Sequence, residues 1–86
     1  MGMMKRLGLA VLEDIHIDGP DTRKALWERN QVCSWEMFKR LIGSLTVDGV
    51  IERRVVTPGK TDPAVDTFAL TEAGKSVVQE ILIEGE

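Results

Sequence analysis

A helix that passes directly into a β-strand is the feature that most constrains how this chain can fold. Between residues 34 and 48 the apolar side chains recur at i, i+3, i+4 and i+7, the spacing of one buried helix face: Phe38, Leu41, Ile42 and Leu45. Ser34 can cap the start of this helix, and Asp48-Gly49 can end it because glycine readily adopts a left-handed conformation. A β-prone run then begins at Val50. We therefore expect a helix that packs by one face and turns sharply into a strand.

The segments on either side extend this pattern to a single α+β domain over residues 1–86. Apolar periodicity and capping residues predict helices over residues 3–15, 21–30, 34–48 and 72–83, the last capped by Thr71. Alternation and turn residues predict a possible short strand at 15–17 and longer strands at 50–56 and 64–70. Proline and glycine in the loop 57–63 indicate that the longer strands form a hairpin. The three-residue turn before Ser34 makes the second and third helices a helix-turn-helix unit.

The outer face of the helix at 34–48 carries the side chains that would meet a partner. Arg40 lies opposite the buried face with Glu36, and Lys39 and Ser44 lie at its margins. Arg40 and Lys39 are the best candidates for contacts with DNA, to a base edge and to a phosphate respectively. Glu36 could accept from a cytosine amino group or form an i, i+4 ion pair with Arg40. Trp35 could close the edge of the core, contact a thymine methyl group, or anchor a protein partner.

Basic side chains outside this helix extend the candidate DNA surface. Arg53 and Arg54 lie on the first strand of the expected hairpin and Lys60 in its loop, where they could contact phosphate or enter a minor groove. Because successive strand residues point to opposite faces, only one of the two arginines should face DNA. Arg23 and Lys24, near the start of the second helix, could contact the DNA backbone. The alternative for each of these cations is a solvated surface residue.

The distribution of charge favours the middle of the chain as the DNA surface. The formal net charge is -3, which argues against a protein that coats nucleic acid without selectivity. Residues 23–60 nevertheless hold eight basic and four acidic side chains, a net charge of +4. Residues 1–22 carry -2 and residues 61–86 carry -5. A positive central region between two negative ends is suggestive of DNA binding.

The first helix could also form a homodimer interface. Its main apolar side, which should face the core, comprises Met3, Met4, Leu7, Ala10, Val11 and Ile15. Leu9 and Leu12 point the other way, either as scattered surface residues or as a dimer interface. A domain of this size buries only about 60–65% of its unfolded surface, so a partner subunit would stabilise it.

The sequence does not favour an enzyme or a membrane protein. It contains no catalytic Ser-His-Asp or Cys-His arrangement, no glycine-rich phosphate loop and no spacing typical of a metal site, so we expect no catalytic residues, cofactor or metal. The single histidine, His16, should be structural or solvent-exposed. Cys33 fits a reducing compartment and could be a packed thiol or, at a helix N-terminus that lowers its pKa, a redox-sensitive one. No apolar run is long enough to span a bilayer, which favours a cytoplasmic location.

Two motifs resemble the winged helix-turn-helix domain of small bacterial and phage transcription regulators of the MarR and PadR type. The first, F-K-R-L-I-G-S-L-T-V-D-G-V-I-E-R-R at residues 38–54, resembles the reader helix, the turn and the first wing strand of that family. The second, F-A-L-T-E-A-G-K at residues 68–75, resembles the second wing strand and the start of the following helix. With the earlier helices, the resemblance covers nearly the whole chain.

This resemblance implies a three-helix core, a two-stranded β-wing and a C-terminal helix. It also implies sequence-specific binding of double-stranded DNA by a homodimeric transcriptional regulator. Winged helices also serve as protein-interaction modules, and a fold does not by itself fix a function. A module that binds a protein partner and no DNA therefore remains the alternative.

Overall fold

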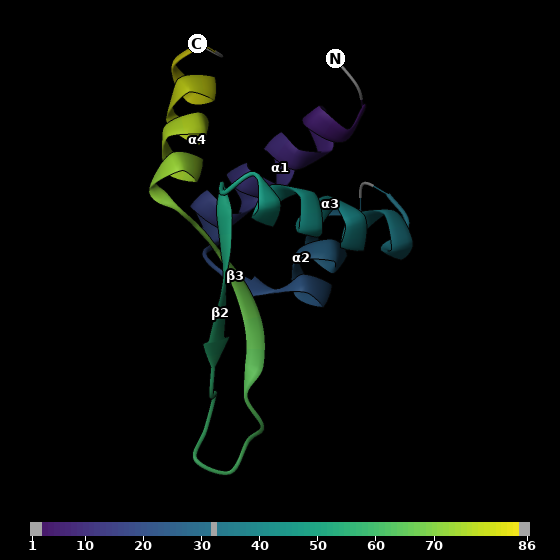
Figure 1. The fold of residues 1–86 in the computed structure, drawn as a ribbon, viewed down its shortest axis with the longest axis vertical. Coiled ribbons are helices and arrows are strands. Elements are labelled where there is room, and N and C mark those ends of the chain that lie inside the picture. Colours follow the sequence, from purple (N-terminus) through teal and green to yellow (C-terminus); the bar gives the residue numbers. More distant parts are fainter. Residues whose placement is uncertain (1–2, 32, 85–86) are drawn as a thin grey trace.

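The computed structural model describes residues 3–31 and 33–84. Within them the chain forms four helices: α1 (Met3–Asp18), α2 (Arg23–Asn30), α3 (Trp35–Val47) and α4 (Glu72–Glu84). It also forms three strands: β1 (Asp21–Thr22), β2 (Ile51–Val56) and β3 (Val65–Leu70). The strands make one antiparallel sheet in the order β1-β3-β2. The hairpin of β2 and β3 extends away from the helices as a wing (Figure 1). The α+β class is confirmed, and the sheet has one more strand than the two expected in the wing.

The end of α1 differs from the prediction, which placed a possible short strand at residues 15–17. These residues continue the helix, because Ile15 lies one turn beyond Val11 and both side chains are buried in the core. Ile17 is 74% exposed, so the alternation of apolar and polar residues here does not reflect a sheet. The helix ends at Asp18 and is followed by Gly19, which has a φ of +89° and whose N–H donates to the Ile15 carbonyl.

The additional strand, β1, lies where the sequence predicted the start of the second helix. Asp21 and Thr22 pair with Phe68 and Thr67 of β3, and α2 therefore begins only at Arg23. The Thr22 hydroxyl accepts from the Ala25 N–H at 3.2 Å and caps the helix. The short pairing attaches the start of the helix-turn-helix unit to the wing.

One arginine joins three elements next to this strand. Arg29 of α2 contacts Asp14 of α1 at 2.6 Å and Asp21 of β1 at 3.0 Å. The hydrogen bonds that Arg29 donates to Asp14, together with the negative charges of Asp14, Asp21 and Asp18, raise the pKa of Arg29 above its usual value. Asp14 and Arg29 are fifteen residues apart, so no local sequence pattern indicates the contact.

The core forms around α1, which packs against α2, α3, α4 and β3. The four predicted core residues of α3 are buried, as are Val11, Leu12 and Ile15 of α1, Leu26 of α2, and Val78 of α4. The expectation that Leu12 lies on an outer face is therefore wrong: its side chain is 2% exposed. Leu12 lies away from the predicted core face of α1, but it is buried because other elements cover α1 on several sides. Leu9 is partly buried at the edge of the core.

The junction between α3 and β2 is held by the start of α4. Gly49 has a φ of +78°, as the predicted helix stop requires, and the Thr71 hydroxyl donates to its carbonyl at 2.6 Å. The same hydroxyl accepts from the Gly74 N–H at 3.1 Å, which confirms Thr71 as the helix cap. The Thr71 N–H donates to the carbonyl of Val50 at 3.1 Å. The two motifs recognised separately in the sequence are thus in direct contact.

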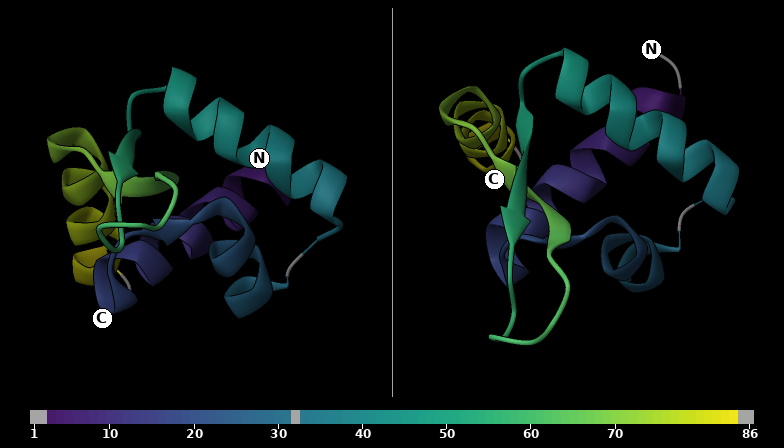
Figure 2. Two further views of the ribbon diagram at one scale, coloured as in Figure 1. Left: turned by 90° about the horizontal axis from the view of Figure 1, so that it is seen from below. Right: turned by 60° about the horizontal axis from the view of Figure 1, so that its bottom comes forward.

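Gly74 has a steric role at this junction. A Cβ atom at position 74 would lie 2.0 Å from the Val50 carbonyl oxygen, well inside van der Waals contact. A residue without a side chain is therefore required for α4 to approach the backbone of Val50, immediately before β2. This contact fixes α4 on one side of the hairpin, while α2 and α3 lie on the other (Figure 2).

Candidate nucleic-acid interface

The helix α3 is oriented by its cap and its buried face. The Ser34 hydroxyl accepts from the Met37 N–H at 3.3 Å, as predicted for the N-cap. Burial of Phe38, Leu41, Ile42 and Leu45 directs the opposite side of the helix to solvent. Glu36 and Arg40 are exposed there, and Lys39 is half-buried. The core thereby sets which side chains α3 can offer to a partner.

The acidic residue on this face pairs with a different cation from the one expected. Lys39 Nζ lies 3.0 Å from Glu36 Oε1, an i, i+3 ion pair, and also 5.8 Å from the centre of the Trp35 ring. The expected i, i+4 pair between Glu36 and Arg40 is not formed in the structure. The Lys39 ammonium group is therefore close to both a carboxylate and an aromatic ring in the first turns of α3. Arg40 is left with its guanidinium in solvent.

Trp35 takes part in the packing at the edge of the core. It is partly buried, and its ring lies 5.4 Å from that of Trp27 at an interplanar angle of 59°. Trp27 Nε1 in turn donates to the Cys33 carbonyl at 2.9 Å. The two rings therefore join α2 to the start of α3 across the helix-turn-helix turn. Of the three roles expected for Trp35, closing the edge of the core is the one seen in these contacts.

Cys33 lies in this turn and its thiol is partly buried. Burial raises the pKa of the Cys33 thiol above its usual value. Of the two roles left open for Cys33 by the sequence, this direction favours the packed thiol over the redox-sensitive one. A raised pKa disfavours the thiolate, which is the reactive form of cysteine.

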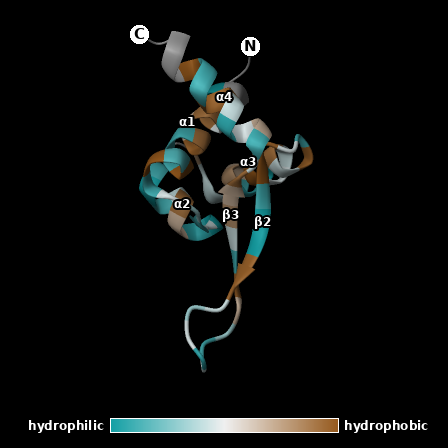
Figure 3. Cartoon of the chain, turned by 90° about the vertical axis from the view of Figure 1, so that its left-hand side faces the viewer, coloured by the Kyte–Doolittle hydropathy of each residue, from teal (hydrophilic) through white to brown (hydrophobic). Residues whose placement is uncertain are grey.

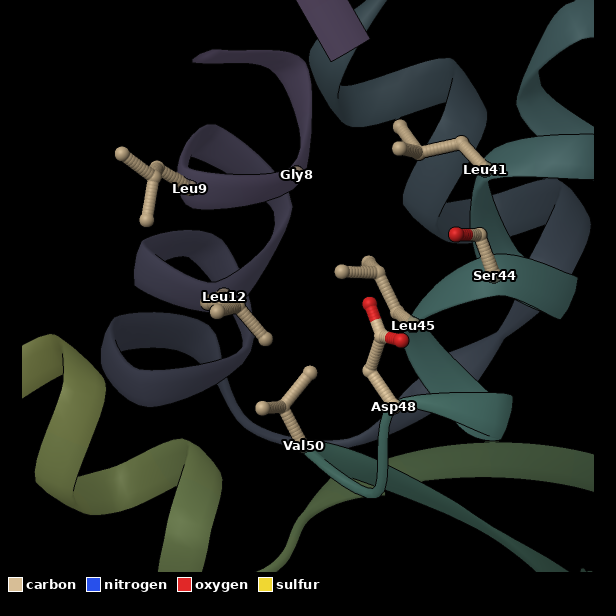
Figure 4. A pocket seen from close by; sticks show the side chains of 8 residues that line it. All are labelled: Gly8, Leu9, Leu12, Leu41, Ser44, Leu45, Asp48 and Val50. Atoms are coloured by element: carbon tan, nitrogen blue, oxygen red, sulfur yellow. The ribbon is translucent and has the colours of Figure 1, made fainter. Parts of the chain in front are cut away.

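Ser44 does not belong to the outer face with Arg40. Its hydroxyl points toward α1, into a groove between α1 and α3 (Figure 4). Helical geometry placed Ser44 at the margin of the outer face of α3, and periodicity alone does not tell to which side of that margin a side chain turns. Ser44 and Arg40 thus face different environments.

The two arginines of the wing lie on opposite faces of β2, as strand alternation predicts. Arg53 is paired across the hairpin with Phe68 and Arg54 with Thr67. Arg54 Nη2 lies 2.6 Å from Glu52 Oε1, and Arg53 Nη1 lies 3.7 Å from Asp66 Oδ2. These pairs are solvent-exposed and contribute at most about 1 kcal/mol each, so a phosphate could replace either carboxylate.

Two apolar residues at the far end of β2 accompany these arginines. Val55 and Val56 are exposed, and the end of the strand forms a hydrophobic section beyond the helices (Figure 3). Lys60 lies further out, in the exposed loop between β2 and β3. The wing therefore offers both charge and apolar surface.

The basic residues at the start of α2 lie in two different surroundings. The guanidinium of Arg23 lies 5.8 Å from the centre of the Phe68 ring of β3, so it covers the sheet. Lys24 is exposed and lines a hollow of about 430 Å³ with Trp27 and Trp35. Among the described residues, no ion pair involves Lys24, Arg40 or Lys60. Arg23 forms no ion pair with a described residue either, so each of the three elements expected to contact DNA carries at least one cation without such a pair.

Other kinds of site find less support in the part of the chain that the structure describes. No three side chains of His, Cys, Asp or Glu come together there as metal ligands would, and His16 is exposed. No helix within these residues has the length and apolar character needed to cross a bilayer.

Comparison by sequence and comparison by structure give different results. No protein-family model and no curated protein matches the sequence. Bacillus subtilis PadR, solved in complex with operator DNA, matches 93% of this chain with a TM-score of 0.75 and 21% identity. The reduced form of the transcriptional regulator YodB from B. subtilis matches 91% with a TM-score of 0.72 and 26% identity. NMB1585, a MarR family regulator from Neisseria meningitidis, matches 91% with a TM-score of 0.68 and 24% identity.

The matched part differs in its share of these proteins. The chain covers 76% of YodB. It covers only 48% of PadR and 53% of NMB1585, about half the length of these two proteins. The chain therefore has a winged helix-turn-helix fold similar to that of MarR- and PadR-like regulators, as the two sequence motifs predicted.

Proposed function

We propose that this chain binds double-stranded DNA sequence-specifically and acts in transcriptional regulation. The outer face of α3 would enter the major groove, and the loop at residues 57–63 would lie over the adjacent backbone. The observation that carries this proposal is the position of Arg40, an exposed and unpaired cation in the middle of a helix whose other face is fixed in the core. Such an arginine can reach the O6 and N7 atoms of guanine. The similarity to a PadR structure solved with operator DNA supports the same mode of binding.

The other cations would position the protein on the duplex. Lys24 and Lys60 lie on α2 and on the wing loop, on either side of α3 in the chain, and both are exposed. Contacts from such side chains to phosphate fix the orientation of a protein without reading sequence. Binding as a homodimer would add a second reader helix, and Leu9 at the edge of α1 remains a candidate for that interface.

A charge-reversal experiment tests this proposal. Arg40→Glu should weaken binding to a selected DNA fragment by about one hundredfold, because a guanine contact worth about 1–3 kcal/mol is replaced by a repulsion. Lys75→Glu in α4 is the matched control, since it changes the net charge equally on an exposed helix away from α3. Mobility shifts at several salt concentrations would give both the affinity and the number of phosphate contacts.

Two results would contradict the proposal. One is the absence of any mobility shift at low salt with fragments selected from genomic DNA. The other is an equal loss of affinity for Arg40→Glu and Lys75→Glu, which would show that only overall charge matters. Circular dichroism of both variants would establish that they fold.

A protein-binding module is the second candidate function, and one observation favours it. The hollow beside Trp27, Trp35 and Lys24 is lined mainly by apolar surface, and tryptophans are frequent anchors of protein interfaces. Trp35→Ala should then abolish binding of the partner, whereas Arg40→Glu should not. The two functions are therefore separated by which of these variants fails.

A further inference from the structure

A groove between α1 and α3 is distinct from the proposed DNA surface. It has a volume of about 360 Å³, within the range of about 300–1,000 Å³ that is typical of small-molecule sites. Leu12 of α1, Leu45 of α3 and Val50 before β2 contribute apolar side chains to its walls (Figure 4). Apolar walls of this kind favour a ligand with a hydrocarbon or aromatic body.

Two polar groups converge on this groove from one helix. Ser44 and Asp48 are four residues apart, so they lie one above the other on the same side of α3 and its C-cap. The Ser44 hydroxyl and the Asp48 carboxylate both point toward the space between the helices (Figure 4). Among the described residues that line the groove, Asp48 is the only one with an ionisable side chain. Its carboxylate forms no ion pair with any other residue that the structure describes.

The position of Asp48 adds to the negative potential at this end of the groove. The C-terminus of a helix carries a partial negative charge, because its last carbonyl groups lack partners within the helix. Asp48 is the C-cap of α3, so its carboxylate and this partial charge act together. A cation is attracted to such a position, whereas a phosphate or a carboxylate is repelled.

We propose that the groove binds a small organic cation, an amine on an apolar body. The ammonium group pairs with Asp48 and donates to the Ser44 hydroxyl, while the body lies against Leu12, Leu45 and Val50. The site is on the α1 side of α3 and uses none of the cations of the proposed DNA surface. The inference therefore goes beyond the proposed function and can be tested without DNA.

Three probes with the same apolar body and different head groups test the charge selectivity. Titration of the full chain with 4-phenylbutylamine, 4-phenyl-1-butanol and 4-phenylbutyrate, followed by amide chemical shifts, gives an affinity and a location for each. The amine should bind about fivefold more tightly than the alcohol, the size of an ion pair with a solvent-exposed carboxylate, and the butyrate should bind most weakly. The shifted amides should be those of Gly8, Ser44 and Asp48.

Two variants locate the interaction. Asp48→Asn keeps the shape of the side chain and should remove the preference for the amine over the alcohol. Glu28→Gln is the matched control on α2, away from the groove, and should keep it. Ser44→Leu should weaken all three probes, because its longer side chain enters the groove from an exposed helix position.

Several results would overturn the proposal. One is equal affinity for the amine and the butyrate, and another is a set of amide shifts that map outside the groove. A third is no binding of the amine at concentrations of about 10 mM, which would mean a binding free energy weaker than about 3 kcal/mol. A dependence of the same amide shifts on protein concentration without any probe would also overturn it, because a second copy of the chain would then cover the groove.

Discussion

The two ends of β2 differ in what holds them in place. At the end where α3 turns into β2, Thr71 donates hydrogen bonds to the carbonyl groups of Gly49 and Val50. Gly74 packs against the Val50 carbonyl. At the other end, next to the loop at residues 57–63, β2 is held by its pairing to β3 and by exposed side-chain contacts. The first region is specified by glycines and backbone hydrogen bonds, the second by residues that can change partners.

This difference shows how the fold separates a rigid platform from a variable surface. The buried side of α3 and the junction fix where the helix lies, whereas the ion pairs at Lys39, Arg53 and Arg54 are exposed and individually weak. A partner such as a DNA backbone can therefore exchange with the carboxylates of these pairs at little cost in stability. Substitutions in the two regions should have very different effects.

The largest effect is expected at the junction. Gly74→Ala would place a methyl group 2.0 Å from the Val50 carbonyl oxygen, and neither backbone segment can move without breaking the contacts of Thr71. We expect a loss of about 3 kcal/mol or more in the free energy of unfolding, measured by urea denaturation. A loss below about 0.5 kcal/mol, within the range of ordinary surface substitutions, would show that the junction is not rigid.

A smaller but still large effect is expected where α1 supports α3. Leu12→Ala should cost about 2–5 kcal/mol, because a buried leucine is replaced by a cavity next to Leu45 and Val50. Leu9→Ala, at the partly exposed edge of the same helix, should cost much less. Thermal unfolding followed by circular dichroism compares the two.

The same helix also allows the dimer prediction to be tested. Leu9→Lys is the suitable variant, since Leu12→Lys would place a charge in the core of one chain. If α1 forms a homodimer interface, Leu9→Lys should give a monomer by light scattering while the helical content is retained. An unchanged mass would remove Leu9 from that interface.

The sequence predicted those parts of the fold that follow from local chemistry. Ser34, Thr71 and Gly49 have the capping and turn conformations expected of them, and α3 buries the four predicted residues. Elements that depend on partners distant in the sequence were harder to predict. The strand β1 exists only because Asp21 and Thr22 meet β3, and Leu12 is buried because other elements cover α1 on more than one side.

The candidate site follows the same division. Periodicity was sufficient to place Arg40 on the outer face of α3, but it could not determine which of its neighbours pairs with Glu36. Lys39 pairs with Glu36 while its ammonium group also lies near the ring of Trp35, and Ser44 turns toward the groove next to α1. Helical geometry gives the angle of a side chain about the axis, whereas its contacts depend on the three-dimensional neighbours.

The smallest effect is expected on the outer face of α3, at Gly43. A Cβ atom built there has nothing within 4 Å, so alanine fits without strain and should raise the helix propensity. Gly43→Ala should stabilise the chain by about 0.5–1 kcal/mol, in contrast to the same substitution at Gly74. Urea denaturation of the two variants compares them directly, and a destabilising Gly43→Ala would contradict the open position of this face. If the proposed DNA complex brings the backbone close to α3, the added methyl group should also weaken DNA binding while the protein becomes more stable, and a mobility-shift assay on the same variant would measure this.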